Sequence, residues 1–129
     1  MYGFAGELRT VNMSKGGFTF PTAKFLPGIV QEFEKEFLDG EPDQVSSYEE
    51  LIKIIAPIHA ELLFIHPFRE GNGRTARLFA DLMTQKMGFK KFNFEEITEE
   101  RMPEYIKAVQ SAAEKNYKPM IELFRKLKE

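Results

Sequence analysis

Residues 65–77 of this chain read IHPFREGNGRTAR, and this stretch decides the fold. An apolar segment with helical spacing leads into it, and a second apolar segment with the same spacing follows it. Pro67 ends the first segment, because proline disfavours helical geometry in the residue before it. Gly71 and Gly73 permit backbone conformations that other residues rarely adopt. The sequence therefore predicts a helix, a tight polar loop and a second helix, in that order.

The polar loop has the composition of an anion-binding site. Successive backbone N–H groups at Gly71, Asn72 and Gly73 can form a concave nest, since no side chain covers the glycine amides. The helix that follows adds its unpaired amides and the positive end of its dipole. Arg74 and Arg77 are three residues apart at the start of that helix, where basic residues oppose the dipole unless an anion lies nearby. A polyphosphate would be a suitable anion.

Two neighbouring side chains add reactive chemistry to this loop. Glu70 lies beside the nest, where a carboxylate is favourable if Mg²⁺ lies between it and a bound phosphate. His66 lies at the mouth of the loop, and an imidazole can take a proton from a hydroxyl near neutral pH. Taken singly, each residue is more often structural, since a histidine at a helix end commonly caps or packs. A structural role explains neither the arginine pair nor the carboxylate, so the combination favours a functional site.

Residues His66 to Arg77 resemble the signature of the Fic family: His-Pro-Phe, any residue, an acid, Gly-Asn-Gly-Arg, two residues and Arg. All fixed positions are met, and residues 5–9 and the segment around Tyr105 are also similar to the family. The resemblance covers essentially the whole chain. It implies a compact all-α domain of about five helices with one β-hairpin. It also implies a protein adenylyltransferase, which transfers AMP from ATP to a Ser, Thr or Tyr hydroxyl of a target protein.

The resemblance also implies a role for each residue of the motif. His66 is the general base, and Glu70, at a position more often occupied by Asp, holds Mg²⁺. Attack at the α-phosphorus follows from the resemblance alone, because the chemistry of the residues permits the transfer of other groups. The nucleotide phosphates are assigned to Gly71, Asn72, Gly73, Arg74 and Arg77.

Composition limits the other possibilities. With 129 residues and 43% hydrophobic content, residues 1–129 are expected to form a single domain with one core. A net charge of −2 argues against a general nucleic-acid binder, and cysteine is absent, which excludes thiolate metal sites and disulfides. No apolar run approaches the roughly 20 residues that cross a membrane, and no secretory segment is visible. We expect a cytosolic protein, or one delivered into a host cell if it is an effector.

The best hairpin signal lies at residues 11–21, where two glycines separate two short segments of strand character. An isolated two-stranded ribbon is only marginally stable, so this one should lie over another part of the domain. The resemblance implies a flap that holds a target segment by strand-like pairing. The alternative is a connecting hairpin without a partner. The flap residues are Lys15, Gly16, Gly17, Phe18 and Thr19.

Apolar spacing and capping residues predict the helices. Ser47, followed three residues later by Glu50, forms a capping-box pattern that starts a central, buried helix. Pro57 lies inside this helix and is expected either to kink it or to leave one backbone carbonyl unpaired. Thr98 is predicted to be the N-cap of a later helix. The predicted helical segments are 23–38, ended by Asp39-Gly40, then 48–65, from the nest to Gly88, 102–114 and 116–128.

Two aromatic groups near these helices are assigned mainly to packing. His59 precedes His66 by two helical turns, a spacing that does not suit a two-histidine zinc site, so we predict a structural or supporting residue. Phe89, Phe92 and Phe94 are expected to pack in the core, although one of them or Asn93 could flank an adenine ring.

The sequence leaves two alternatives for how the activity of the site is inhibited. Many family members contain, or receive from a partner, a helix whose Glu pairs with the second arginine of the motif. Residues 111–116 have suitable residue types at the wrong spacing, and the chain begins near Ala5, where relatives have a preceding helix. We therefore expect either a shortened chain or an antitoxin-like partner whose inhibitory helix pairs with Arg77.

Three functions stay open from the sequence. The first is AMP transfer. The second is transfer of another phosphate-linked group, such as phosphocholine or a terminal phosphate. Gly73 counts against phosphate transfer, because kinase-like relatives have lysine there. The third is a non-catalytic module that binds phosphate or peptide, which needs neither the base His66 nor the metal ligand Glu70.

Overall fold

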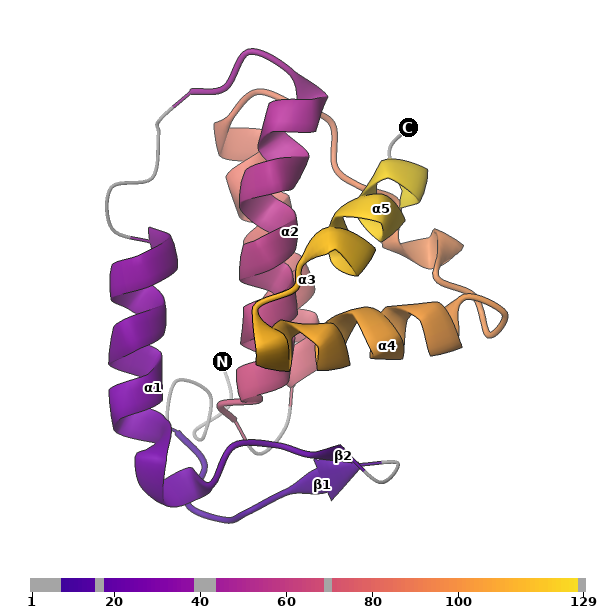
Figure 1. The fold of residues 1–129 in the computed structure, drawn as a ribbon. Helices are drawn as coiled ribbons and strands as arrows, with labels where there is room; N and C mark the ends of the chain where they lie inside the picture. The colour runs from indigo at the N-terminus through magenta and orange to yellow at the C-terminus, as the bar shows by residue number, and fades with distance from the viewer. Residues whose placement is uncertain (1–7, 16–17, 39–43, 69–70, 128–129) are drawn as a thin grey trace.

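The computed structural model describes residues 8–15, 18–38, 44–68 and 71–127 (Figure 1). These residues contain five α-helices and two short strands. The prediction of an all-α domain of about five helices is confirmed. None of the helices in the described residues combines the length and the apolarity needed to cross a membrane. The helices are α1 (Leu26–Phe33), α2 (Tyr48–Ile65), α3 (Asn72–Lys86), α4 (Met102–Ser111) and α5 (Lys118–Leu127), and the strands are β1 (Ser14–Lys15) and β2 (Phe18–Thr19).

Helix α2 is the centre of the domain. Figure 1 shows α1 on one side of it and α4 and α5 on the other, and all three helices and α3 contact α2. A helix with neighbours on several sides must be apolar around much of its circumference. The sequence of α2 meets this requirement, and its buried apolar residues are Leu51, Ile52, Ile55, Ala56, Ile58, Ala60 and Ile65.

The prediction of one core needs a correction, because buried residues form two clusters on different sides of α2. The larger joins α2 to α4 and α5, around Phe124 and Met120, and the smaller joins α2 to α1, around Leu26 and Phe33. The central helix itself separates them. Phe64 and Met83 are half-buried and pack against both clusters, so the two halves are still in contact.

The predicted bounds of α2 are confirmed at both ends. The Ser47 hydroxyl accepts a hydrogen bond from the Glu50 amide at 3.2 Å, as an N-cap should. The Glu50 carboxylate accepts from the Ser46 amide at 2.8 Å and the Ser46 hydroxyl at 2.7 Å, so the return half of the capping box contacts Ser46. Pro57 lies inside α2, which continues through it as one helix.

The predicted helical segments 23–38 and 102–114 are confirmed when their short 3₁₀ and π turns are included, but the predicted N-cap of α4 is wrong. Thr98 is not the N-cap of α4. Its backbone carbonyl accepts from the amides of Arg101 and Met102 in a separate turn, and Arg101 is the N-cap. Short 3₁₀ turns precede α1 (Ala23–Phe25) and follow α4 (Ala112–Glu114), and α1 continues into a π-helical turn (Glu34–Leu38). Asp39, Gly40 and Lys128 lie outside the described residues.

The strands β1 and β2 pair antiparallel, with Ser14 opposite Thr19 and Lys15 opposite Phe18. Gly16 and Gly17, the predicted turn between them, lie outside the described residues. Past β2, the Phe20 amide donates to the Met13 carbonyl at 3.1 Å and extends the pairing. The ribbon lies beside the end of α2, in keeping with the expectation that it covers another part of the domain (Figure 1).

Candidate active site

His66 is the residue that ends α2. Its backbone lies in the left-handed region, at φ 50° and ψ 59°, and its amide donates to the Leu62 carbonyl at 3.2 Å. The sequence predicted that Pro67 would pull His66 out of helical geometry, and the structure shows a left-handed C-cap. Such a conformation costs a residue with a side chain roughly 1–2 kcal/mol, so neighbouring contacts must hold it in place.

Arg9 provides part of that support. It is only 2% exposed, and its amide donates to the Pro67 carbonyl at 2.8 Å. A guanidinium at the end of α2 is favourable there because helix carbonyls form the negative end of the dipole. Burial lowers the pKa of Arg9, yet an arginine remains charged at neutral pH. The guanidinium donates to the backbone carbonyls of His66 (2.6 Å), Ile65 (3.3 Å), Pro21 (2.6 Å) and Val11 (2.9 Å).

Phe20 holds the His66 ring from the side of the ribbon. The two rings stack with centroids 4.0 Å apart and planes 11° from parallel, and Phe20 is buried. Because Phe20 directly follows β2, the ribbon and the candidate base are mechanically joined. Sequence reasoning gave no role to Phe20 and named Arg9 only within a similar segment. Each contact joins residues far apart in the chain, so no local pattern announces it.

The Asn72 side chain closes the loop between α2 and α3. Its amide oxygen accepts from the Phe68 backbone amide at 2.9 Å, and its amide nitrogen donates to the Phe68 carbonyl at 2.7 Å. Asn72 is buried, so its side chain is used by the loop and only its backbone remains for a ligand. Glu70, the predicted metal ligand, lies outside the described residues.

The N-terminus of α3 provides amides for an anion. Gly71 is the N-cap at φ 79°, and its carbonyl accepts the first helical bond, from Thr75 at 2.9 Å. The amides of Asn72, Gly73 and Arg74 come before that bond and have no partner within the helix. No atom lies within 4 Å of where a Cβ would stand on Gly71 or Gly73, so the space over both is open.

The two glycines should respond oppositely to alanine. Gly71→Ala is expected to lower the free energy of unfolding by roughly 1–2 kcal/mol, because it forces a side chain into the left-handed region. Gly73 lies in α3 without a positive φ, so Gly73→Ala should raise the free energy of unfolding by about 0.5–1 kcal/mol. Urea denaturation of both variants measures the difference. Equal effects would show that the left-handed turn at Gly71 is not needed.

The two arginines of the motif differ in their surroundings. Arg74 is exposed on the first turn of α3, whereas Arg77 is half-buried. The buried Nε of Arg77 has no hydrogen-bond partner among the described residues. A buried guanidinium donor without a partner is costly, and a bound anion would satisfy it.

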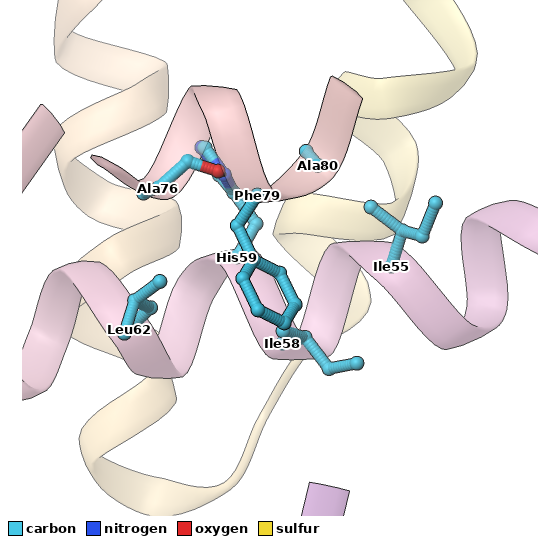
Figure 2. A pocket seen from close by; sticks show the side chains of 7 residues that line it. All are labelled: Ile55, Ile58, His59, Leu62, Ala76, Phe79 and Ala80. Atoms are coloured by element: carbon cyan, nitrogen blue, oxygen red, sulfur yellow. The ribbon is translucent and has the colours of Figure 1, made fainter. Parts of the chain in front are cut away.

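His59 lies in an apolar seam between α2 and α3. Figure 2 shows Ile55, Ile58 and Leu62 on α2 and Ala76, Phe79 and Ala80 on α3. The seam between the two helices has no room for a small molecule. Burial lowers the pKa of His59 to about 4, so the ring is neutral at pH 7. The described residues hold no cluster of three metal-ligating side chains. The prediction that His59 is structural or supporting is confirmed.

The aromatic residues after α3 are packed in the core, as expected. Phe92 is buried against Phe124, with ring centroids 5.0 Å apart, and Phe94 stacks on His59 at 5.4 Å. The Asn93 side chain accepts from the Glu95 amide at 3.2 Å and caps a 3₁₀ turn. These contacts leave the packing interpretation of Phe92 and Phe94 as the supported one.

Comparison with known proteins places this geometry in context. A family model described as the Fic/DOC family matches residues 1–84. The protein adenylyltransferase fic-1 of Caenorhabditis elegans is 38% identical over 85 residues, which are 66% of this chain and 16% of that protein. The protein adenylyltransferase Fic of Drosophila willistoni is 34% identical over 84 residues, 65% of this chain and 16% of the relative. The chain thus spans only a small part of these relatives.

Solved structures are similar over nearly the whole chain. The BepC protein of Bartonella tribocorum, a VirB-translocated effector with bound AMPPNP, has a TM-score of 0.74 and 29% identity, and the match covers 92% of this chain and 56% of that one. The N-terminal Fic domain of a putative cell filamentation protein of Bartonella quintana, a VirB-translocated effector with bound ADP, has a TM-score of 0.77 and 26% identity. This second match covers 98% of this chain and 64% of the other.

Proposed function

The chain belongs to the Fic/DOC family, and we propose that it is a protein adenylyltransferase that transfers AMP from ATP to a Ser, Thr or Tyr hydroxyl of a target protein. The observation that carries the proposal is the meeting of two helix ends. The C-terminus of α2 presents an imidazole at His66, and α3 presents its N-terminal amides and, in its second turn, Arg77. The curated relatives are adenylyltransferases, and two solved relatives contain adenine nucleotides.

The nucleotide phosphates would lie over the start of α3. The amides of residues 72–74 and the helix dipole favour negative charge there, and the open space at Gly71 admits it. The Nε of Arg77, buried without a partner among the described residues, fits an anion of this kind. Arg74 and Arg77 would hold the β- and γ-phosphates. Glu70 would hold Mg²⁺, which neutralises phosphate charge when bound.

His66 would act as the general base. Its imidazole would take the proton of the target hydroxyl while the hydroxyl oxygen forms a bond to the α-phosphorus of ATP. The bond from that phosphorus to the oxygen bridging the α- and β-phosphates breaks, and pyrophosphate leaves. Arg9 and Phe20 support this role because they fix the backbone and the ring of His66. A base held in place loses less rate to misorientation.

The target protein would bind along the ribbon of β1 and β2. Thr19 of β2 is exposed, and a two-stranded ribbon has unpaired edges that can accept a further strand. The flap would comprise Lys15, Gly16, Gly17, Phe18 and Thr19. Phe20 joins this surface to His66, which would bring a bound segment close to the base.

Control and compartment also belong to the proposal. An antitoxin-like partner could place a carboxylate on Arg77 and exclude the phosphates from it. We propose that the enzyme works in a cytosol, where ATP is available, either of the cell that makes it or of a host cell. The similar Bartonella proteins are VirB-translocated effectors, which supports the second of these.

Peptide mass spectrometry tests the proposed product. The chain is incubated with ATP, Mg²⁺ and a cell lysate, and modified peptides are sought. Adenylyl groups on hydroxyl side chains are expected, and they should be absent when ATP is omitted. Phosphoryl or phosphocholine groups in their place would support transfer of another group. A chain that binds ATP and modifies no protein in any lysate tested would support the non-catalytic module.

A further inference from the structure

A hydrogen-bonded chain of side chains crosses the core behind the candidate phosphate site. It begins at His59, which is 1% exposed in the middle of α2. The Nδ1 of His59 lies 3.3 Å from the Ala76 carbonyl on α3, and Nε2 lies 2.7 Å from the Tyr105 hydroxyl on α4. The chain of side chains therefore links α2 to α4 and to α3, the helix that carries Arg77.

The direction of these bonds is fixed by their partners. A backbone carbonyl can only accept, so Nδ1 of His59 must carry the proton and Nε2 must be the acceptor. The Tyr105 hydroxyl then donates its single proton to Nε2 and can only accept from any further partner. Burial lowers the pKa of His59 to about 4 and raises the pKa of Tyr105 to about 12, so this arrangement persists at neutral pH.

Arg77 is the further partner of Tyr105. Its positive charge and a hydrogen bond from its side chain both act to lower the pKa of Tyr105, and its charge also lowers the pKa of His59. The guanidinium thus contacts Tyr105 on one side, while its buried Nε has no partner among the described residues. A guanidinium that is held on one side and has an unpaired donor on another is suited to a ligand.

Packing alone does not account for the pair. His59 lies among Phe94, Phe124 and the apolar residues of the seam. Burying an imidazole and a hydroxyl in such a place costs free energy that an apolar pair would not, even when the two are hydrogen-bonded. A polar pair at this depth is better explained by the group that it orients.

We propose that His59 and Tyr105 are positioning residues that aim the Arg77 guanidinium at the β- and γ-phosphates of ATP. The proposal rests on the proposed function, because it assigns a new role at the same site. It predicts that loss of the Tyr105 hydroxyl weakens the binding of nucleotides that have β- and γ-phosphates more than the binding of AMP, which has neither.

Tyr105→Phe tests this with the removal of one oxygen atom. Tyr117→Phe is a matched control, because the Tyr117 hydroxyl donates to the buried Glu61 carboxylate at 2.6 Å. The affinities of each variant for ATP and for AMP are measured by calorimetry at a temperature where that variant is folded. Tyr105→Phe should weaken the binding of ATP about tenfold, which is the order of one hydrogen bond to a charged group. The binding of AMP should weaken less than twofold. Tyr117→Phe should change neither.

A double-mutant cycle separates positioning from a general effect on the fold. In an Arg77→Ala background, Tyr105→Phe should no longer weaken ATP, because its effect passes through Arg77. A loss that persists there, or an equal loss for ATP and AMP, would overturn the proposal. His59→Leu provides a second variant, and it too should weaken the binding of ATP more than the binding of AMP. If the intact chain binds no ATP, the proposed function itself fails.

Discussion

Replacing His66 with alanine is expected to lower AMP transfer to protein by about 10²–10⁴-fold, the usual contribution of a general base. Affinity for ATP should change little, because the amides and arginines that would hold the phosphates belong to α3, whereas His66 ends α2. Initial rates of AMP incorporation over a range of ATP concentrations measure both quantities. The loss should therefore appear in kcat, with KM for ATP close to that of the intact chain.

A second variant separates the base from the backbone. His66 occupies the left-handed region, which asparagine adopts more readily than alanine does. His66→Asn therefore preserves the helix end, and its side chain cannot take the proton. Both variants should lose AMP transfer to a similar extent, although His66→Asn should be the more stable. Transfer at the intact rate by His66→Asn would contradict the role of base.

Replacing Arg9 with methionine is expected to lower the free energy of unfolding of the domain substantially. Arg9 is buried, and its guanidinium donates to four backbone carbonyls at distances between 2.6 and 3.3 Å. Methionine fills part of the volume but leaves those acceptors without the donor. A loss of about 3 kcal/mol in the free energy of unfolding is expected, the order of a few buried acceptors left unsatisfied.

Arg9→Lys is the matched control for charge. Lysine keeps the positive charge at the end of α2 but has one nitrogen in place of the guanidinium fork. The Arg9→Lys variant should keep the favourable interaction with the helix dipole. Its single nitrogen cannot donate at once to the carbonyls of Pro21, Val11 and the end of α2. Urea denaturation should rank the intact chain above Arg9→Lys, and Arg9→Lys above Arg9→Met. A methionine variant as stable as the intact chain would show that these hydrogen bonds contribute nothing net.

Activity offers an independent measure of Arg9. At a temperature where Arg9→Met is folded, the His66 carbonyl has lost its partner and the base is held less firmly. AMP transfer should then fall while ATP affinity changes little. This pattern would separate a loss of positioning from a loss of folded protein, since unfolded protein lowers both.

Sequence signals that act within a few residues predicted the framework well. The start of α2 follows from Ser47 and Glu50, which contact each other across one turn, and its end follows from Pro67. The apolar residues of α2 surround it, so burial could be predicted as well. Thr98 was assigned wrongly as a cap because its carbonyl forms a turn before α4, a competition that residue type alone does not reveal.

The candidate site could be proposed from the sequence where its residues are contiguous, and not where it depends on distant contacts. Residues 66–77 follow one another in the chain, so their combination could be seen. Arg9 contacts His66 across 57 positions and Phe20 contacts it from the ribbon, and neither pairing leaves a local pattern. The contact between His59 and Tyr105 spans 46 positions. Such support becomes visible only when the helices are packed.

A comparison of ATP labelled at the α-phosphate with ATP labelled at the γ-phosphate distinguishes AMP transfer from its alternatives in one step. Each nucleotide is incubated with the chain, Mg²⁺ and a cell lysate, alongside the His66→Asn variant. We predict label on protein from the α-position only, and none with the variant. Label from the γ-position only, or α-label that persists with His66→Asn, would contradict AMP transfer with His66 as the base.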